Sequence, residues 1–311
     1  MEAVRAYLES HLERTHAKMR EVLSSDIALL DGFNRSVLGR PGKMVRPALS
    51  LLSADIAGEI SDLSISVAAA AELLHNATLM HDDVVDGAAE RRGLPTAMSI
   101  MGPSAAVLMG DYWLVKAVNC LIGAGSGEVL LVRLFARTLS DLAEGELLQM
   151  QKAESLDTLE EDYLRIIYCK TASLFELAAR CGAISAGASP EKEEALAAFG
   201  RNVGLAFQIR DDILDYEGGA IGKPSHIDLQ ERKITLPFLL SDGSDGLRGE
   251  LRRGNIDKVY DGVVAGGGID RAYERIRVYI DAAVASLSIL PEGAKRDRLV
   301  AIADYIADRK L

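Results

Sequence analysis

Apolar residues recur every three or four positions along most of the chain, which is the spacing of residues on one face of an α-helix. No stretch alternates with period two for long enough to predict a sheet. No linker or low-complexity segment divides the sequence. We therefore expect one all-α domain over residues 1–311. The pattern predicts helices over residues 3–36, 44–57, 62–86, 103–121, 130–153, 159–186, 190–216, 234–240, 255–264, 269–289 and 291–308.

The stretch LLHNATLMHDDVVDGAAERR, residues 73–92, ends an apolar helical pattern with three carboxylates. Asp82 and Asp86 are four residues apart, so they lie on one helix face about 6 Å apart along the axis, with Asp83 beside them. Gly87 suggests that the helix stops here, and the macrodipole disfavours anions at a helix C-terminus. We therefore expect a cation to neutralise this first acidic cluster.

The stretch NVGLAFQIRDDILDYEGG, residues 202–219, repeats the arrangement with Asp211, Asp212 and Asp215. A single cluster of this kind is more typical of a solvated helix end. Two identical clusters, each ending an apolar helix, favour a binding site instead. Hard oxygen ligands with room for water and phosphate suit Mg²⁺ that is held jointly by the protein and a diphosphate.

Cations and a hydroxyl accompany the carboxylates. In GKMVRP, Lys43 and Arg46 lie three residues apart beside a glycine turn, so both can reach one anion. Adjacent arginines offer two planar forks for phosphate. Each residue alone is more often an ordinary surface or helix residue, but together they fit an apolar cavity with a charged mouth. The candidates are Lys43, Arg46, Arg91, Arg92, Lys170, Thr171, Lys223 and Lys233.

Composition narrows the classes of function. The net charge of −11 disfavours nucleic acid as a partner. No apolar run reaches the length of a membrane span, and the charged start of the chain does not resemble a signal peptide. Cys120, Cys169 and Cys181 are odd in number and lack metal-ligand spacing. Buried thiols in a reducing compartment are therefore expected, which favours a cytoplasmic protein.

Taken together, the motifs resemble those of the trans-type polyprenyl diphosphate synthases, of the geranylgeranyl and octaprenyl type. The segments GKMVRP, HDDVVD followed by RR, GDYW, GELLQ, KT, FQIRDDILD, GKPSHIDL and KITLP occur in the family's order and spacing over residues 43–237. The resemblance implies an isoprenoid-synthase helix bundle around a central apolar cavity, working as a homodimer. It also implies a prenyltransferase that adds isopentenyl diphosphate to an allylic diphosphate, five carbons in each cycle.

The same resemblance implies roles for individual residues. Three Mg²⁺ ions on the allylic diphosphate would be held by Asp82, Asp83, Asp86, Asp211, Asp212 and Asp215. The expected catalytic residues are Lys170 and all of these aspartates except Asp215. Contacts to the allylic diphosphate would come from Arg91, Lys170, Thr171, Gln208, Lys223 and Lys233. The isopentenyl diphosphate site would consist of Lys43, Arg46, His75 and Arg92.

Two positions depart from the family's pattern, since His226 and Arg232 stand where the family usually has glycine. Their bulk and charge are expected to alter how the loop closes over the diphosphate, and they weaken the assignment of Lys233. If the family resemblance is set aside, His75 is interpreted as a partly buried helix histidine that is hydrogen-bonded to a carbonyl.

The helix of the first cluster also bears on product length. Ala77 and Thr78 precede Asp82 by five and four residues, about 6 to 7 Å deeper along the helix. In family members that stop at fifteen carbons, one or both positions are typically aromatic. Both are small here, so we expect a product of at least twenty carbons, in the long-chain range. Leu74 lies deeper on the same side of the helix. Trp113 either closes the far end of the cavity that holds the growing prenyl chain or is an ordinary core residue.

Other functions remain open at this point. A class I terpene cyclase also uses an aspartate-rich motif with Mg²⁺, but it would leave GKMVRP and Arg92 unexplained. Its second metal motif normally mixes Asn, Ser or Thr with Glu, unlike DDILD. A regulatory subunit of a heteromeric prenyl synthase has usually lost an acidic motif, and this chain keeps both. A helical scaffold leaves the repeated carboxylates without a purpose.

Overall fold

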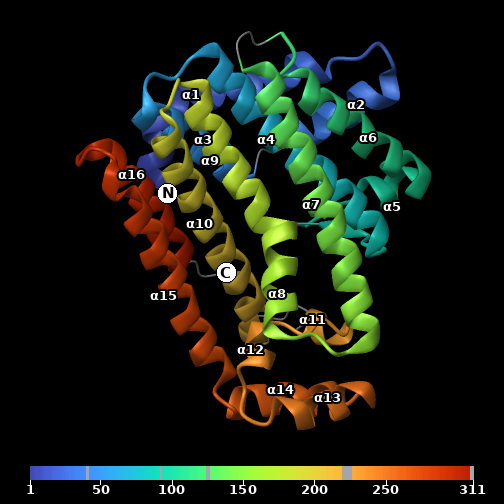
Figure 1. Cartoon of the computed structure of the whole chain (residues 1–311). Coiled ribbons are helices and arrows are strands. Elements are labelled where there is room, and N and C mark those ends of the chain that lie inside the picture. Colours follow the sequence, from blue (N-terminus) through green and yellow to red (C-terminus); the bar gives the residue numbers. More distant parts are fainter. Residues whose placement is uncertain (40–41, 92, 124–126, 219–225, 309–311) are drawn as a thin grey trace. The chain divides into compact units, whose positions relative to one another are not determined.

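The structure is a computed structural model that describes the chain apart from residues 40–41, 92, 124–126, 219–225 and 309–311 (Figure 1). Nearly all of its regular structure is helical. The strands among the described residues form one short antiparallel hairpin, β1 (Glu90–Arg91) with β2 (Leu94–Pro95), in which Arg91 lies opposite Leu94. The prediction of an all-α chain is confirmed.

The chain divides into two compact units, and three long helices contribute residues to both of them: α7 (Glu128–Ser155), α9 (Ser173–Ser185) and α10 (Pro190–Glu217). The first unit is Met1–Ala136 with Leu177–Glu194, and the second is Arg137–Glu176 with Ala195–Leu311. The other helices of the first unit are α1 (Glu2–Leu23), α2 (Ala28–Leu38), α3 (Val45–Ala57), α4 (Asp62–Val85), α5 (Ala97–Met101) and α6 (Pro103–Asn119). Those of the second are α8 (Glu160–Ile167), α11 (Ile227–Gln230), α12 (Leu236–Leu239), α13 (Ser244–Arg252), α14 (Ile256–Ala265), α15 (Gly268–Ser286) and α16 (Ala294–Ala307), with a 3₁₀ turn at Leu287–Ile289.

Helix α4 is the centre of the first unit, where it packs against α1, α3 and α6. It begins with a capping box, in which the Ser61 hydroxyl accepts from the Ser64 N–H and the Ser64 hydroxyl accepts from the Ser61 N–H. It ends at Val85, and Gly87, two residues further on, has a φ of +64° that suits glycine. Among the described residues, α4 is the one helix long and apolar enough to cross a membrane. In the most apolar 18-residue stretch of α4, 67% of the residues are buried inside the protein, as in a core helix.

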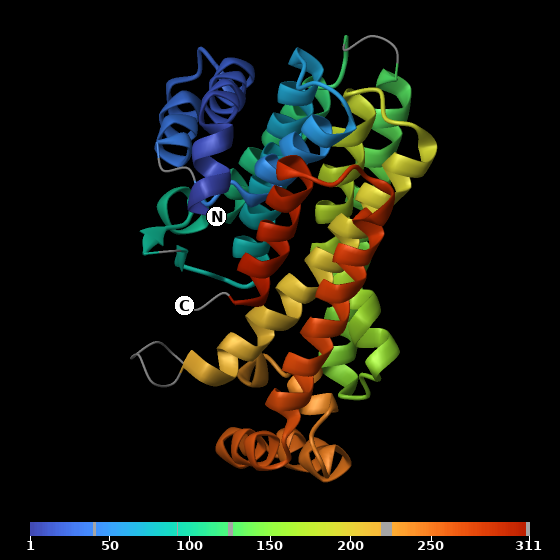
Figure 2. The ribbon, with the colours of Figure 1, turned by 90° about the vertical axis from the view of Figure 1, so that its left-hand side faces the viewer.

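The second unit is built on α15, which packs against α12, α14 and α16. Helices α13 and α14 pair with each other across one end of α15 (Figure 2). An apolar cluster that includes Tyr216, Leu229 and Phe238 lies here, with Tyr260 packed against it. The cluster joins the end of α10 to the short helices that follow it.

The helices expected from periodicity differ from the observed ones at several places. The segment expected as one helix over 3–36 is two helices, broken at residues 24–27. The segment 159–186 is interrupted by a π-helix, Tyr168–Ala172, between α8 and α9. The expected loop after α10 contains α11, and α5 and α13 were not predicted. Apolar spacing continues across such breaks, so it does not reveal them.

Candidate active site

The first acidic cluster occupies the last turn of α4. Asp83 is buried, and its Oδ1 accepts a hydrogen bond of 2.6 Å from Nε of Arg91 on β1. Asp82 is half-buried and Asp86 is exposed. Because successive helix residues are rotated by about 100°, Asp82 and Asp86 share a face that Asp83 does not. The three carboxylates therefore have different surroundings despite their regular spacing.

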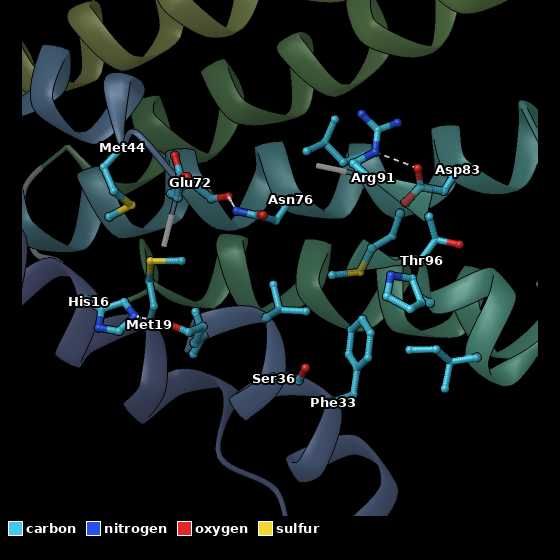
Figure 3. A pocket seen from close by; sticks show the side chains of 18 residues that line it. His16, Met19, Phe33, Ser36, Met44, Glu72, Asn76, Asp83, Arg91 and Thr96 are labelled. Atoms are coloured by element: carbon cyan, nitrogen blue, oxygen red, sulfur yellow. Dashed lines mark hydrogen bonds and ion pairs between the residues drawn. The ribbon is translucent and has the colours of Figure 1, made fainter. Parts of the chain in front are cut away.

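A cavity of about 300 Å³ lies beside this cluster within the first unit (Figure 3). One wall is the stripe of α4 that carries Glu72, Asn76 and Asp83, and Met19 and Phe33 come from α1 and α2. Among the described residues, the ionisable groups lining it are two carboxylates, one guanidinium and the imidazole of His16. A diphosphate beside these groups would need further cations to balance its charge.

The second acidic cluster lies in a hydrogen-bonded network inside the second unit. The Thr171 hydroxyl donates a hydrogen bond of 2.6 Å to the side-chain oxygen Oε1 of Gln208. The side-chain Nε2 of Gln208 donates one of 2.8 Å to Oδ1 of Asp212. The hydroxyl of Tyr163 on α8 donates to Oδ2 of the same carboxylate at 2.6 Å. Thr171, Gln208 and Asp212 were each candidates from the sequence, and the structure brings them together. Tyr163 was missed, because an aromatic residue on the apolar face of a helix is typical of the core.

Burial and neighbouring charges perturb the acids of this cluster. Burial raises the pKa of Asp212 to about 6, with a further contribution from the carboxylates of Asp211 and Asp215. The hydrogen bonds from Tyr163 and Gln208 oppose this shift. Burial, with Asp212 and Asp215 nearby, also raises the pKa of Asp228 well above its usual range. The cluster thus holds more negative charge than its own donors stabilise.

The π-helix positions Lys170 and Thr171. A π turn adds a residue to the helix and so re-aims the side chains within it, and such turns are frequent at functional sites. Nζ of Lys170 lies 2.5 Å from Oε2 of Glu146 on α7. Gly145 permits this approach, because a Cβ there would lie 2.6 Å from Cβ of Cys169. Lys170 is therefore paired with a carboxylate of the GELLQ motif.

Asp215 has a different environment from its counterpart Asp86. Its Oδ1 and Oδ2 accept hydrogen bonds from the backbone N–H groups of Ile227, at 3.0 Å, and Asp228, at 3.2 Å. Asp215 therefore holds the first turn of α11, which brings Asp228 close to the cluster. Asp228 was missed as a site residue. Its signal was available, since it lies in the segment GKPSHIDL.

Comparison with known proteins decides the family. Residues 28–245 match the Polyprenyl synthetase family. The chain belongs to this family. It is 35% identical to an octaprenyl diphosphate synthase of Escherichia coli, over 99% of each chain. It is 38% identical to an all-trans-nonaprenyl-diphosphate synthase (geranyl-diphosphate specific) of Rhodobacter capsulatus, over 94% of this chain and 92% of the relative.

A solved structure is similar throughout. The polyprenyl synthase of Caulobacter crescentus, in complex with calcium and isoprenyl diphosphate, has a TM-score of 0.91 and 32% identity, over 99% of this chain and 97% of the other. The resemblance predicted from the motifs is therefore confirmed, and so are the isoprenoid-synthase fold class and the prediction of a prenyl-transferring enzyme.

The structure of this synthetase shows why glycine suits the two positions at which the chain departs from the family pattern. His226 has a φ of +67° and Arg232 a φ of +60°. Glycine adopts this left-handed backbone freely, whereas other residues pay about 1–2 kcal/mol. Arg232 is exposed, while the ring of His226 lies against Tyr260. The two positions therefore share a backbone strain but differ in their contacts.

The remaining candidates for substrate binding have varied surroundings. Lys43 is exposed, and Arg46 and His75 are half-buried, all in the first unit. Nζ of Lys233 lies 2.5 Å from Oε2 of Glu231. Arg92 and Lys223 lie outside the described residues. Among the described residues, no group of three or more His, Cys, Asp or Glu side chains is gathered closely enough to hold a metal ion.

The residues expected to control product length lie in the first unit of the synthetase. Leu74 and Ala77 are buried and Thr78 is half-buried. Trp113 is fully buried, and its Nε1 donates a 2.9 Å hydrogen bond to Oδ1 of Asn34 on α2. Burial with a satisfied indole N–H is typical of a core residue, which favours the core alternative for Trp113. Cys120, Cys169 and Cys181 are buried free thiols, as expected.

Proposed function

We propose that this synthetase condenses isopentenyl diphosphate with an allylic diphosphate. The observation that carries the proposal is the contact network of Thr171, Gln208 and Asp212, because all three are expected around the allylic diphosphate. Lys170 lies in the same π-helix as Thr171. A cation and hydrogen-bond donors beside carboxylates are the groups that a metal-bound diphosphate requires.

Mg²⁺, as three ions, is the proposed cofactor, and the donor chemistry fits it. The candidate ligands are carboxylate oxygens, which hard divalent cations prefer. Burial and the neighbouring carboxylates of Asp211 and Asp215 raise the pKa of Asp212, so negative charge is concentrated where the cation is proposed to bind. The relative with calcium and isoprenyl diphosphate supports a divalent cation. When bound, Mg²⁺ stabilises the charge that develops on the departing diphosphate. The proposed ligands are Asp82, Asp83, Asp86, Asp211, Asp212 and Asp215.

The protein's own cations complete the proposed substrate sites. Arg91 is paired with Asp83, and Lys170 with Glu146. Each would exchange part of this pairing for the allylic diphosphate, whose oxygens carry more charge than one carboxylate. The proposed contacts to that diphosphate are Arg91, Lys170, Thr171, Gln208, Lys223 and Lys233. Those to isopentenyl diphosphate are Lys43, Arg46, His75 and Arg92.

The proposed product has twenty or more carbons, in the long-chain range. Ala77 and Thr78 are small, so no aromatic side chain at these positions blocks the growing prenyl chain. Leu74 lies one helical turn further from the first cluster. The names of the octaprenyl and nonaprenyl relatives support the same range.

We further propose a homodimer, and α6 supports it. Leu108 and Val115 lie two helical turns apart on α6 and are 68% and 59% exposed, and Ile100 on α5 is 64% exposed. An exposed apolar stripe of this kind is typical of a surface that another chain covers. We also propose a single domain. Its support is that the boundaries between the two units fall inside the continuous helices α7, α9 and α10. A cytoplasmic protein without a membrane span remains our proposal.

The test is a prenyl-transfer assay with the purified chain, Mg²⁺, labelled isopentenyl diphosphate and geranyl diphosphate. We expect labelled product that chelation of Mg²⁺ abolishes. Asp82→Asn and Asp211→Asn should each lower the rate about a hundredfold or more. Asp245→Asn, at a fully exposed aspartate on α13, should leave the rate unchanged. Wild-type rates for both cluster variants would contradict the proposal. A folded but inactive chain would favour a subunit that requires a partner, or a cyclase.

A further inference from the structure

His226 adopts a backbone conformation that its side chain disfavours, and its ring makes a specific contact. The ring centroid lies 4.0 Å from that of Tyr260 on α14, with an angle of 41° between the planes. Nδ1 of His226 is buried. Tyr260 in turn packs on the apolar cluster that contains Leu229 and Tyr216. The start of α11 is therefore attached to α14 by an aromatic contact as well as by Leu229.

The turn anchored in this way is the one that holds Asp215. The N–H groups of Ile227 and Asp228, the two residues after His226, donate to the two carboxylate oxygens of Asp215. The N–H of His226 itself points to the backbone carbonyl of Asp215 at 3.5 Å. Three successive N–H groups thus face one residue of the second acidic cluster. A change in the position of His226 changes the placement of Asp215 and Asp228 together.

We propose that His226 is a positioning residue of this chain, whose contact with Tyr260 fixes the start of α11 and so holds Asp215 and Asp228 beside Asp212. The inference rests on the proposed function, in which this cluster binds Mg²⁺ and the allylic diphosphate. His226 acts through α11 and touches neither the metal nor the substrate. Its loss therefore weakens binding at the cluster more than it slows the chemical step.

Arg232 provides a matched control. It has the same left-handed backbone, six residues further along the chain, but its side chain is exposed. Replacing either residue by glycine relieves the same strain. Only the change at position 226 removes an aromatic contact. A comparison of the two glycine variants thus separates the contact from the backbone.

The experiment compares His226→Gly, His226→Phe, Tyr260→Leu and Arg232→Gly with the wild type. For His226→Gly and Tyr260→Leu we expect KM for geranyl diphosphate and the Mg²⁺ concentration for half-maximal rate to rise roughly three- to tenfold, the scale of one aromatic contact. We expect kcat to change less than about twofold. His226→Phe should restore the wild-type values, because it keeps the ring, and Arg232→Gly should match the wild type.

Two readouts do not depend on turnover. Calorimetry with inorganic diphosphate and Mg²⁺ should give a Kd that rises by the same factor for His226→Gly. Hydrogen exchange of the peptide 226–231 should be faster in that variant, while its thermal stability stays at or above that of the wild type.

Wild-type binding and exchange in His226→Gly would overturn the inference, as would equal effects of Arg232→Gly. An inactive wild type would refute the proposed function instead, and the exchange measurement would still decide on His226.

Discussion

Gly204 allows α10 to approach the π-helix closely enough to form the Thr171–Gln208 hydrogen bond. A Cβ at position 204 would lie 2.5 Å from Cα of Ala172 and 3.0 Å from Cβ of Phe175. Carbon atoms in contact prefer about 3.5–4.0 Å. Gly204→Ala must therefore separate the two segments by about 1 Å.

The same separation acts on the site, because Thr171 is next to Ala172 and Gln208 lies one turn after Gly204. The Thr171–Gln208 hydrogen bond of 2.6 Å would lengthen to about 3.6 Å, which is too long for a hydrogen bond. Overpacking costs about 1–3 kcal/mol, partly offset by about 1 kcal/mol for alanine over glycine in a helix. A displacement of about 1 Å at a reacting site lowers rates by about a hundredfold.

The assay is kcat for prenyl transfer at saturating Mg²⁺ and diphosphates, together with thermal unfolding. We expect Gly204→Ala to lose about two orders of magnitude in kcat and to unfold at a lower temperature. Gly249→Ala is the control, because Gly249 lies inside α13 with nothing within 4 Å of the added Cβ. It should be slightly more stable and fully active. Wild-type activity and stability of Gly204→Ala would refute the reasoning.

Three further predictions concern charge, product length and assembly. In the metal-free protein, the folded pKa of Asp212 is about 6 against 3.8 unfolded, so its contribution to stability is present at low pH and is lost as the pH rises from about 4 to above 6. Asp212→Asn should therefore stabilise the metal-free protein by on the order of 2–3 kcal/mol at pH 7.5 and very little at pH 4, as measured by urea unfolding. Equal effects at both pH values would show that ionisation of Asp212 is not the cause. Ala77→Phe should shorten the longest product to about fifteen carbons, seen by chromatography of the dephosphorylated products, whereas Trp113→Ala should leave the length unchanged if Trp113 serves only the core. Leu108→Glu should weaken the dimer at least about tenfold in sedimentation experiments, whereas Val278→Glu, at a 59% exposed valine on α15, should not; a dimer unaffected by Leu108→Glu would place the interface elsewhere.

The long helices of this synthetase are readable from sequence because each has one apolar face and a definite end. Helix α4 is the clearest case, since Ser61 caps its start and Gly87 its end. Periodicity did not reveal the π-helix at Tyr168–Ala172, because apolar residues continue on both sides of it. It also did not reveal α11, whose four residues are shorter than two helical turns.

Site residues could be predicted where they belong to a sequence motif with a regular spacing. Contacts that depend on how closely two helices pack could not be predicted in this way. Asp212, Gln208 and Thr171 were found by motif, but their mutual contacts depend on Gly204 and the π-helix. Asp215 has the spacing of Asp86, yet its carboxylate binds the backbone of α11. Tyr163 reaches the cluster from α8, where no motif points to it, whereas Asp228 lies in the motif GKPSHIDL and could have been assigned from it.

The most direct test of the account is the size of the product. Purified protein with Mg²⁺ and labelled isopentenyl diphosphate would be given dimethylallyl, geranyl or farnesyl diphosphate in turn, and the dephosphorylated products would be separated by chromatography. The account predicts a ladder in steps of five carbons that ends at or beyond twenty. Termination at fifteen carbons would show that Ala77 and Thr78 do not leave the path open, and no elongation by the folded protein would contradict the proposed condensation itself.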